Sequence, residues 1–183
     1  MRPTHWPKLG RLLLLAPHLL AAGDFTGTVS SVADGDTLTV LYGEGAIRVR
    51  LDGIDCPEKD QPSGAAARRF TSELALGQIV TVVEEDIDRY GRIVATVILP
   101  DGRSLNHEIV AAGWAWWYRK YAPDDVALRD LEARARKEGR GLWSEAVPTP
   151  PWEWRKQDHV TARSDRRRSE PRSQVRYSRR LAR

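Results

Sequence analysis

One stretch of the chain decides how the rest is organised: Arg50-Leu51-Asp52-Gly53-Ile54-Asp55-Cys56-Pro57-Glu58. It continues an alternation of apolar and charged residues that begins at Ile47, which predicts a strand with one apolar face. The strand ends before Pro57, because proline cannot donate a hydrogen bond to a β-ladder. We therefore expect Arg50, Asp55 and Glu58 to lie at one end of a sheet, where unlike charges on a rigid element indicate a functional site.

The sequence predicts one folded domain between two ends of different character. Residues 1–23 combine a basic start, an apolar run and small residues, which predicts an export signal and hence a periplasmic or secreted protein. A retained membrane anchor is the alternative, although the apolar run is shorter than the ~20 residues of a spanning helix. No further transmembrane segment is expected. Residues 24–147 should form the domain, as a monomer, and residues 148–183 a proline linker followed by an Arg-rich, disordered tail.

The charge is unevenly distributed. Residues 24–150 contain 15 Lys and Arg against 21 Asp and Glu, a balance of −6, whereas residues 151–183 contain 11 against 4, a balance of +7. The tail could therefore bind nucleic acid or an anionic surface, and the body could bind cations, although solvated charge without a partner is the plainer alternative. The single cysteine, Cys56, excludes an internal disulfide and gives little support for a zinc site.

Alternating segments predict a mainly β structure with helices, an α+β class. Five strands are the clearest, at 24–32, 37–42, 47–53, 78–85 and 92–99. Three helices are expected, at 65–76, 105–112 and 124–139. The first two strands should be joined by a tight Asp34-Gly35 turn with positive φ angles, and Ser104 should be the N-cap of the second helix. Consecutive hairpins with helices added suggest a small Greek-key barrel capped by helices.

Two aspartates should meet at one end of this barrel. Asp36 begins the second expected strand and Asp55 follows the third, and these positions lie at the same end of an antiparallel meander. Carboxylates so placed can hold a hard cation such as Ca²⁺ through oxygen, with the backbone carbonyl of Cys56 as a further ligand.

The neighbouring charged residues fit hydrolysis of a phosphodiester. Glu58 lies close enough to reach a metal-bound water as general base. Arg50 and Arg92 can bind phosphate oxygens and stabilise the additional negative charge of a five-coordinate transition state. Each residue alone could be a turn former or a surface ion pair, but the set together favours catalysis.

Aromatic residues are concentrated in Trp114-Ala115-Trp116-Trp117-Tyr118, followed by Tyr121. Packing in the core is the plainer interpretation, because aromatic side chains bury large areas. A surface on which nucleobases stack is the alternative, and it fits Tyr118 and Tyr121 best because Arg119 and Lys120 lie between them.

Five motifs in order resemble the staphylococcal-nuclease-like (thermonuclease) family, from about Phe25 to Ser144. They are Val32-Ala33-Asp34-Gly35-Asp36-Thr37, the Arg50 to Glu58 stretch, Asp88-Arg89-Tyr90-Gly91-Arg92, Asn106-His107-Glu108-Ile109-Val110-Ala111-Ala112-Gly113 and Gly141-Leu142-Trp143. The resemblance implies an OB-fold five-stranded β-barrel capped by three α-helices. It also implies a calcium-dependent nuclease that hydrolyses DNA and RNA with little sequence preference and leaves 3′-phosphates.

The resemblance assigns roles to particular residues. Metal ligands would be Asp36, Asp55 and the carbonyl of Cys56; catalytic residues would be Arg50, Glu58 and Arg92; and nucleotide-binding residues would be Tyr118 and Tyr121. Two departures stand out: cysteine replaces threonine at position 56, and the loop after Glu58 is short with few lysines. A catalytically silent nucleic-acid-binding module on the same fold is the alternative function.

Overall fold

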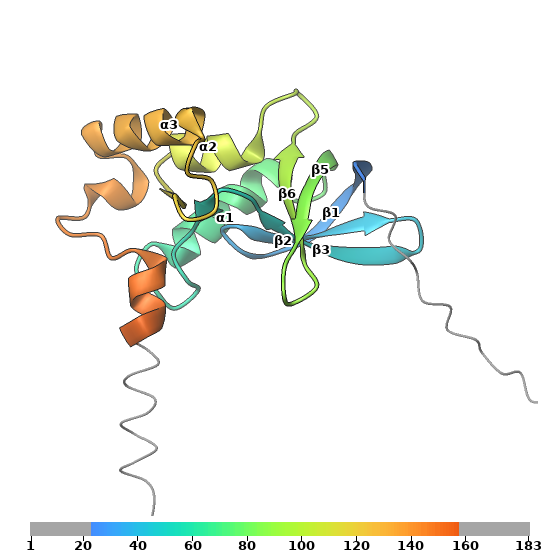
Figure 1. Ribbon diagram of the computed structural model, residues 1–183, viewed down its shortest axis with the longest axis horizontal. Coiled ribbons are helices and arrows are strands. Elements are labelled where there is room, and N and C mark those ends of the chain that lie inside the picture. The colour runs from blue at the N-terminus through green and yellow to red at the C-terminus, as the bar shows by residue number, and fades with distance from the viewer. Residues whose placement is uncertain (1–22, 158–183) are drawn as a thin grey trace, which may run out of the picture.

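The computed structural model describes residues 23–157, so the predicted export signal, apart from Gly23, and residues 158–183 of the tail lie outside the described residues. Five strands close into a barrel in the order β1-β2-β3-β6-β5 (Figure 1). Their bounds are β1 Phe25–Asp34, β2 Thr37–Tyr42, β3 Gly45–Leu51, β5 Ile79–Ile87 and β6 Ile93–Ile98. The predicted α+β class and OB-fold barrel are confirmed.

Strand β3 determines how the barrel closes. It pairs antiparallel with β2, with Arg50 opposite Thr37, and parallel with β6, with Arg50 beside Val94. The apolar side chains that alternate along β2 and β3 point inward, and Leu38, Val40 and Val49 are fully buried. The alternation therefore leaves Arg50 on the opposite face from the core residues Val49 and Leu51.

A second, two-stranded sheet was not predicted from the sequence. Strand β4 (Ile54–Asp55) pairs antiparallel with β7 (Trp116–Trp117), so that Asp55 lies opposite Trp116. Two-residue strands are too short to show alternation. Both tryptophans are buried, as the core-packing interpretation of the aromatic segment expected. The consequence for the site is that backbone pairing with β7 holds Asp55 in position.

The three predicted helices are confirmed with small shifts in their ends: α1 is Gly64–Ala75, α2 is Leu105–Ala111 and α3 is Val126–Lys137, and a short 3₁₀ helix follows at Gly141–Ser144. Ser104 caps α2 as predicted, since its side chain accepts a hydrogen bond from the His107 amide. Val126, the first residue of α3, is more than half exposed. Within residues 23–157, no helix is both long and apolar enough to cross the bilayer.

The ordered chain extends beyond the predicted domain end at residue 147. Residues 151–157 are helical and form the orange segment beside the loop before α1 in Figure 1. This segment is attached to that loop, because Gln61 Nε2 donates to the Thr149 carbonyl at 2.5 Å and Ser63 Oγ donates to Glu145 Oε1 at 2.6 Å. Proline in a first helical turn is favourable, and Pro151 begins this helical stretch.

The turn between β1 and β2 was predicted correctly, but the reason for its glycine was not. Gly35 is not among the residues with positive φ. A Cβ atom at this position would instead lie 2.7 Å from both Cβ and Sγ of Cys56 and 3.0 Å from the Ala67 Cβ. Glycine is therefore needed for the close approach of the hairpin to the segment that follows β4 and to α1.

Gly35→Ala should lower the free energy of unfolding by about 2 kcal/mol, because the added methyl group overpacks the contact with Cys56. Gly45→Ala is a matched control, since its Cβ would come no closer than 3.6 Å to the Tyr42 carbonyl oxygen. Urea denaturation measures both changes. Equal stabilities for the two variants would contradict the close-approach explanation.

Candidate active site

The guanidinium of Arg50 lies at the centre of the predicted cluster. Its Nη1 lies 2.5 Å from Asp36 Oδ2, and its Nη2 donates to Asp55 Oδ1 at 2.9 Å and to the Ile54 carbonyl at 3.1 Å. The two aspartates are almost fully buried, and the side chain of Arg50 is 15% exposed. Asp36 and Asp55 therefore lie close together at one end of the barrel, as predicted.

Asp36 is oriented by its neighbours in the fold. The amide of Cys56 donates to Asp36 Oδ2 at 2.6 Å, and the hydroxyl of Thr37 donates to Oδ1 at 3.3 Å. The amide of Asp36 in turn donates to Asp34 Oδ1 at 3.2 Å. These bonds connect the β1–β2 turn to the segment after β4, so the carboxylate is placed by both.

Arg92 reaches the same end of the barrel from the start of β6. Its Nε donates to Asp88 Oδ2 at 2.7 Å, and its Nη1 lies 3.4 Å from the hydroxyl of Thr37, which is itself bonded to Asp36. The ring of Tyr90 lies beneath this guanidinium, with the centroid 5.7 Å from Cζ. Although burial acts in the opposite direction, hydrogen bonds from the backbone and side chain of Arg92 lower the pKa of Asp88.

Glu58 lies on the loop between β4 and α1 and is partly exposed. Its amide donates to Gln61 Oε1 at 3.1 Å, which fixes the start of the loop. Its carboxylate contacts a residue that the sequence interpretation did not include: Arg155 Nη1 donates to Glu58 Oε1 at 2.5 Å. The same guanidinium donates from Nη2 to Asp55 Oδ2 at 2.7 Å.

Two carboxyl groups at this end of the barrel, those of Asp34 and Asp55, have raised pKa values. Burial, and then the charge of Asp36, raise the pKa of Asp34 to about 7. Burial also raises the pKa of Asp55, and Asp36 adds to this effect, whereas the hydrogen bond from Arg155 and the charge of Arg50 oppose it. Asp36 thus has a second carboxyl group on either side, Asp34 and Asp55, and this concentration of negative charge favours the binding of positive charge.

The oxygen atoms of this cluster fit a hard cation. Within residues 23–157, no three His, Cys, Asp or Glu side chains are grouped so as to hold a metal ion. Two adjacent carboxylates are present, however, and hard cations complete their shells with backbone carbonyls and water. The Cys56 side chain contacts the β1–β2 turn, and burial raises the pKa of its thiol well above the usual range, so only the Cys56 carbonyl is a suitable donor.

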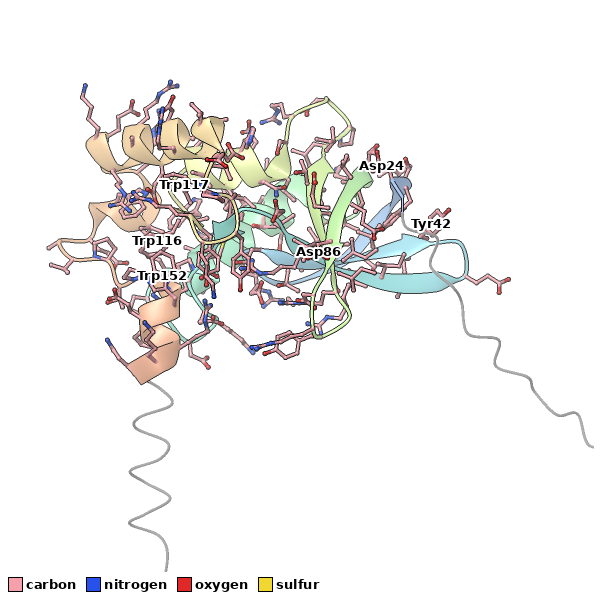
Figure 2. The ribbon with its side chains drawn as sticks, viewed as in Figure 1. Asp24, Tyr42, Asp86, Trp116, Trp117 and Trp152 are labelled. Carbon is pink, nitrogen blue, oxygen red and sulfur yellow. The ribbon has the colours of Figure 1, made fainter. Side chains whose placement is uncertain are left out.

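The two predicted nucleotide-binding tyrosines differ in exposure. Tyr121 is 64% exposed and packs edge-on against Tyr118, with ring centroids 4.9 Å apart. Tyr118 is partly buried because Trp152 stacks parallel to it, with centroids 5.4 Å apart. Figure 2 shows Trp152 beside Trp116, whose ring centroid is 6.3 Å away. Aromatic and basic residues around this stack line an open cavity of about 860 Å³; they include Trp116, Tyr118, Arg119, Trp152 and Lys156.

Sequence reasoning missed Arg155, Tyr90 and the contribution of Asp34. Tyr90 and Asp34 lie within motifs already recognised, so their positions beside Arg92 and Asp36 could have indicated them. Arg155 lies in a segment assigned to the tail. The sequence signal for a short docked helix is the Pro150-Pro151 pair together with Trp152 and Trp154, which precede Arg155.

Comparison with known proteins agrees with this arrangement. The family model for staphylococcal nuclease homologues matches residues 48–145. An uncharacterised endonuclease of Escherichia coli is 46% identical over 132 residues, which cover 72% of this chain and 86% of that protein. A micrococcal nuclease of Shigella flexneri is 40% identical over 145 residues, which cover 74% of this chain and 83% of that protein. The chain therefore belongs to the staphylococcal nuclease homologue family, and this membership supports nuclease activity.

Removing the Asp34 charge should change how stability depends on pH. Because the folded-state pKa of about 7 is above the unfolded value, ionisation of Asp34 favours the unfolded state, and stability falls as pH rises from about 4 through 7. In chelator, Asp34→Asn should lose this fall and gain roughly 1 to 3 kcal/mol over the parent chain between pH 5 and 8.

Chemical denaturation at several pH values measures this gain. The matched control is Asp60→Asn, which removes an exposed carboxylate from the loop beside the site. Parallel pH profiles for Asp34→Asn and the parent chain would contradict the assignment.

Proposed function

We propose that this protein is an exported, calcium-dependent nuclease that hydrolyses phosphodiester bonds of DNA and RNA with little sequence preference and leaves 3′-phosphates. The observation that carries the proposal is the cluster in which Arg50 contacts Asp36 and Asp55, with Arg92 and Glu58 at its edge. Family membership supports the same activity.

The residues suited to hold the calcium ion are Asp36 and Asp55, with the backbone carbonyl of Cys56. Bound there, the ion would supply a Lewis acid for a phosphate oxygen and lower the pKa of a coordinated water. Oxygen ligands suit calcium, and the two carboxylates are held next to each other by one guanidinium. Magnesium and manganese share this preference for oxygen, so the choice of calcium rests on the resemblance to the family.

The side chains of this protein would have separate roles in the reaction. Glu58 would accept a proton from the attacking water, which raises its nucleophilicity. Arg50 and Arg92 would donate hydrogen bonds to the non-bridging oxygens of the phosphate and stabilise the charge that develops as the water attacks. None of these groups reads a base edge, which supports cleavage with little sequence preference. Tyr121 and Tyr118 would bind a neighbouring base by stacking.

Glu58→Gln should lower the rate of single-stranded DNA hydrolysis by about a thousandfold, because the amide cannot accept the proton. DNA binding, measured by fluorescence anisotropy in calcium, should be retained. The matched control is Glu44→Gln, which changes an exposed glutamate in the β2–β3 turn.

The parent chain should cleave DNA in calcium and lose this activity in chelator. Near-normal cleavage by Glu58→Gln would remove Glu58 from the role of base. Absence of cleavage by the folded parent chain at every calcium concentration would favour the silent nucleic-acid-binding module instead.

A further inference from the structure

A second arginine, Arg155, occupies the open side of the cluster. Its Nη2 lies 2.7 Å from Asp55 Oδ2, and its Nη1 lies 2.5 Å from Glu58 Oε1 and 3.3 Å from Asp55 Oδ1. Because Arg50 donates to Asp55 Oδ1, both oxygens of this aspartate are bonded to guanidinium groups. The carboxylate assigned to the metal and the carboxylate assigned to the base thus share one intramolecular cation.

Arg155 lies 100 residues from Asp55 along the chain and is brought to the cluster by the C-terminal segment, residues 145–157. The contacts that hold the segment include the hydrogen bond from Gln61 to the Thr149 carbonyl, the hydrogen bond from Ser63 to Glu145, and the packing of Trp152 against Tyr118 and Trp116. All of these lie outside the charged cluster. The docking of the segment against the barrel therefore determines where Arg155 lies.

The two arginines of the cluster differ in how readily they can leave. The Arg50 side chain is 15% exposed and belongs to β3 of the barrel, whereas that of Arg155 is 39% exposed and belongs to the C-terminal segment. The Asp55 side chain is only 2% exposed, but it keeps its bond to Arg50 when Arg155 leaves, so the buried carboxylate is not left without a cation. Arg155 lies in no strand of the barrel, whereas Arg50 lies in β3.

A guanidinium and a divalent cation exclude each other at the same oxygens, because like charges repel and each carboxylate has few lone pairs to share. A base whose oxygen already accepts a strong, charge-assisted hydrogen bond is also a poor acceptor for the proton of water. Arg155 opposes both metal binding at Asp55 and proton transfer to Glu58.

We propose that Arg155 is an internal cation that competes with the divalent metal for Asp55 and Glu58, so that the C-terminal segment must leave the cluster before the metal binds. This inference rests on the proposed function, since it takes Asp55 as a metal ligand and Glu58 as the base. The segment is then an autoinhibitory latch, which sets the metal concentration at which the enzyme becomes active.

Calorimetric titration of the full chain with Ca²⁺ tests the latch. Arg155→Ala should bind calcium roughly ten- to a hundredfold more tightly than the parent chain, because the competitor is gone. Arg155→Lys, which keeps the charge, should remain closer to the parent. Lys156→Ala is the matched control: it removes a positive charge from the next, exposed residue and should leave calcium affinity unchanged.

A second variant and a second measurement separate release of the segment from loss of the charge. Trp152→Ala, which removes the stack on Tyr118 but keeps Arg155, should also bind calcium more tightly. In the parent chain, calcium should accelerate hydrogen exchange at the amides of Glu153 and Trp154, which donate to the Pro150 carbonyl in the docked segment.

The outcomes distinguish the latch from the proposed function. Equal calcium affinities for Arg155→Ala and the parent chain, or weaker binding by the variant, would overturn the latch and leave the calcium site standing. Absence of calcium binding by both proteins would overturn the calcium site, and the latch with it. If Arg155→Ala binds calcium tightly and the double variant Arg155→Ala/Asp36→Asn does not, the gain in affinity arises at the carboxylate cluster.

Discussion

The structure depends on the contact of one buried guanidinium with two buried carboxylates. Two carboxylates next to each other in the interior repel each other, and Arg50 supplies the positive charge between Asp36 and Asp55. Although burial acts against its charge, the ion pairs raise the pKa of Arg50 above its usual range. The barrel is built so that this contact forms, because the register of β3 with β2 places Arg50 opposite Thr37, next to Asp36.

Several parts of the fold converge on this contact. The β1–β2 turn approaches closely enough for the Cys56 amide to bond Asp36, which is the reason for Gly35. The short pairing of β4 with β7 holds Asp55 in place through the aromatic segment. Removing one partner of a buried ion pair leaves an uncompensated charge, so the site and the fold are energetically linked. The two more exposed members of the cluster, Glu58 and Arg155, lie at the edge where substrate, water and ions can reach it.

The barrel and most of the candidate site could be predicted because they follow from local patterns. Alternating residues indicated β2 and β3, and the end of a strand is a local property, so the proximity of Asp36, Asp55 and Arg50 followed from the antiparallel meander. The β4–β7 pairing could not be predicted, because two residues show no period. The role of Gly35 was misread because a turn glycine and a close-contact glycine look the same in a sequence.

Arg155 illustrates the limit of this reasoning most clearly. Its contacts with Asp55 and Glu58 depend on how a segment some 100 residues away docks, and the high arginine content of the C-terminal region favoured an unstructured tail. Four aromatic and polar contacts, among them the Trp152–Tyr118 stack, outweigh that composition for residues up to 157. Net charge describes the solubility and partners of a segment better than it describes its packing.

The most direct test of the account is the rate of phosphodiester hydrolysis by Arg50→Lys at saturating calcium, with the folded state verified by circular dichroism and thermal unfolding. Lysine keeps the positive charge but cannot bond Asp36, Asp55 and a phosphate oxygen with a planar fork. The account predicts a rate at least about a hundredfold below that of the parent chain in a folded protein. A folded Arg50→Lys variant that cleaves DNA at the parent rate would contradict the central role of this guanidinium.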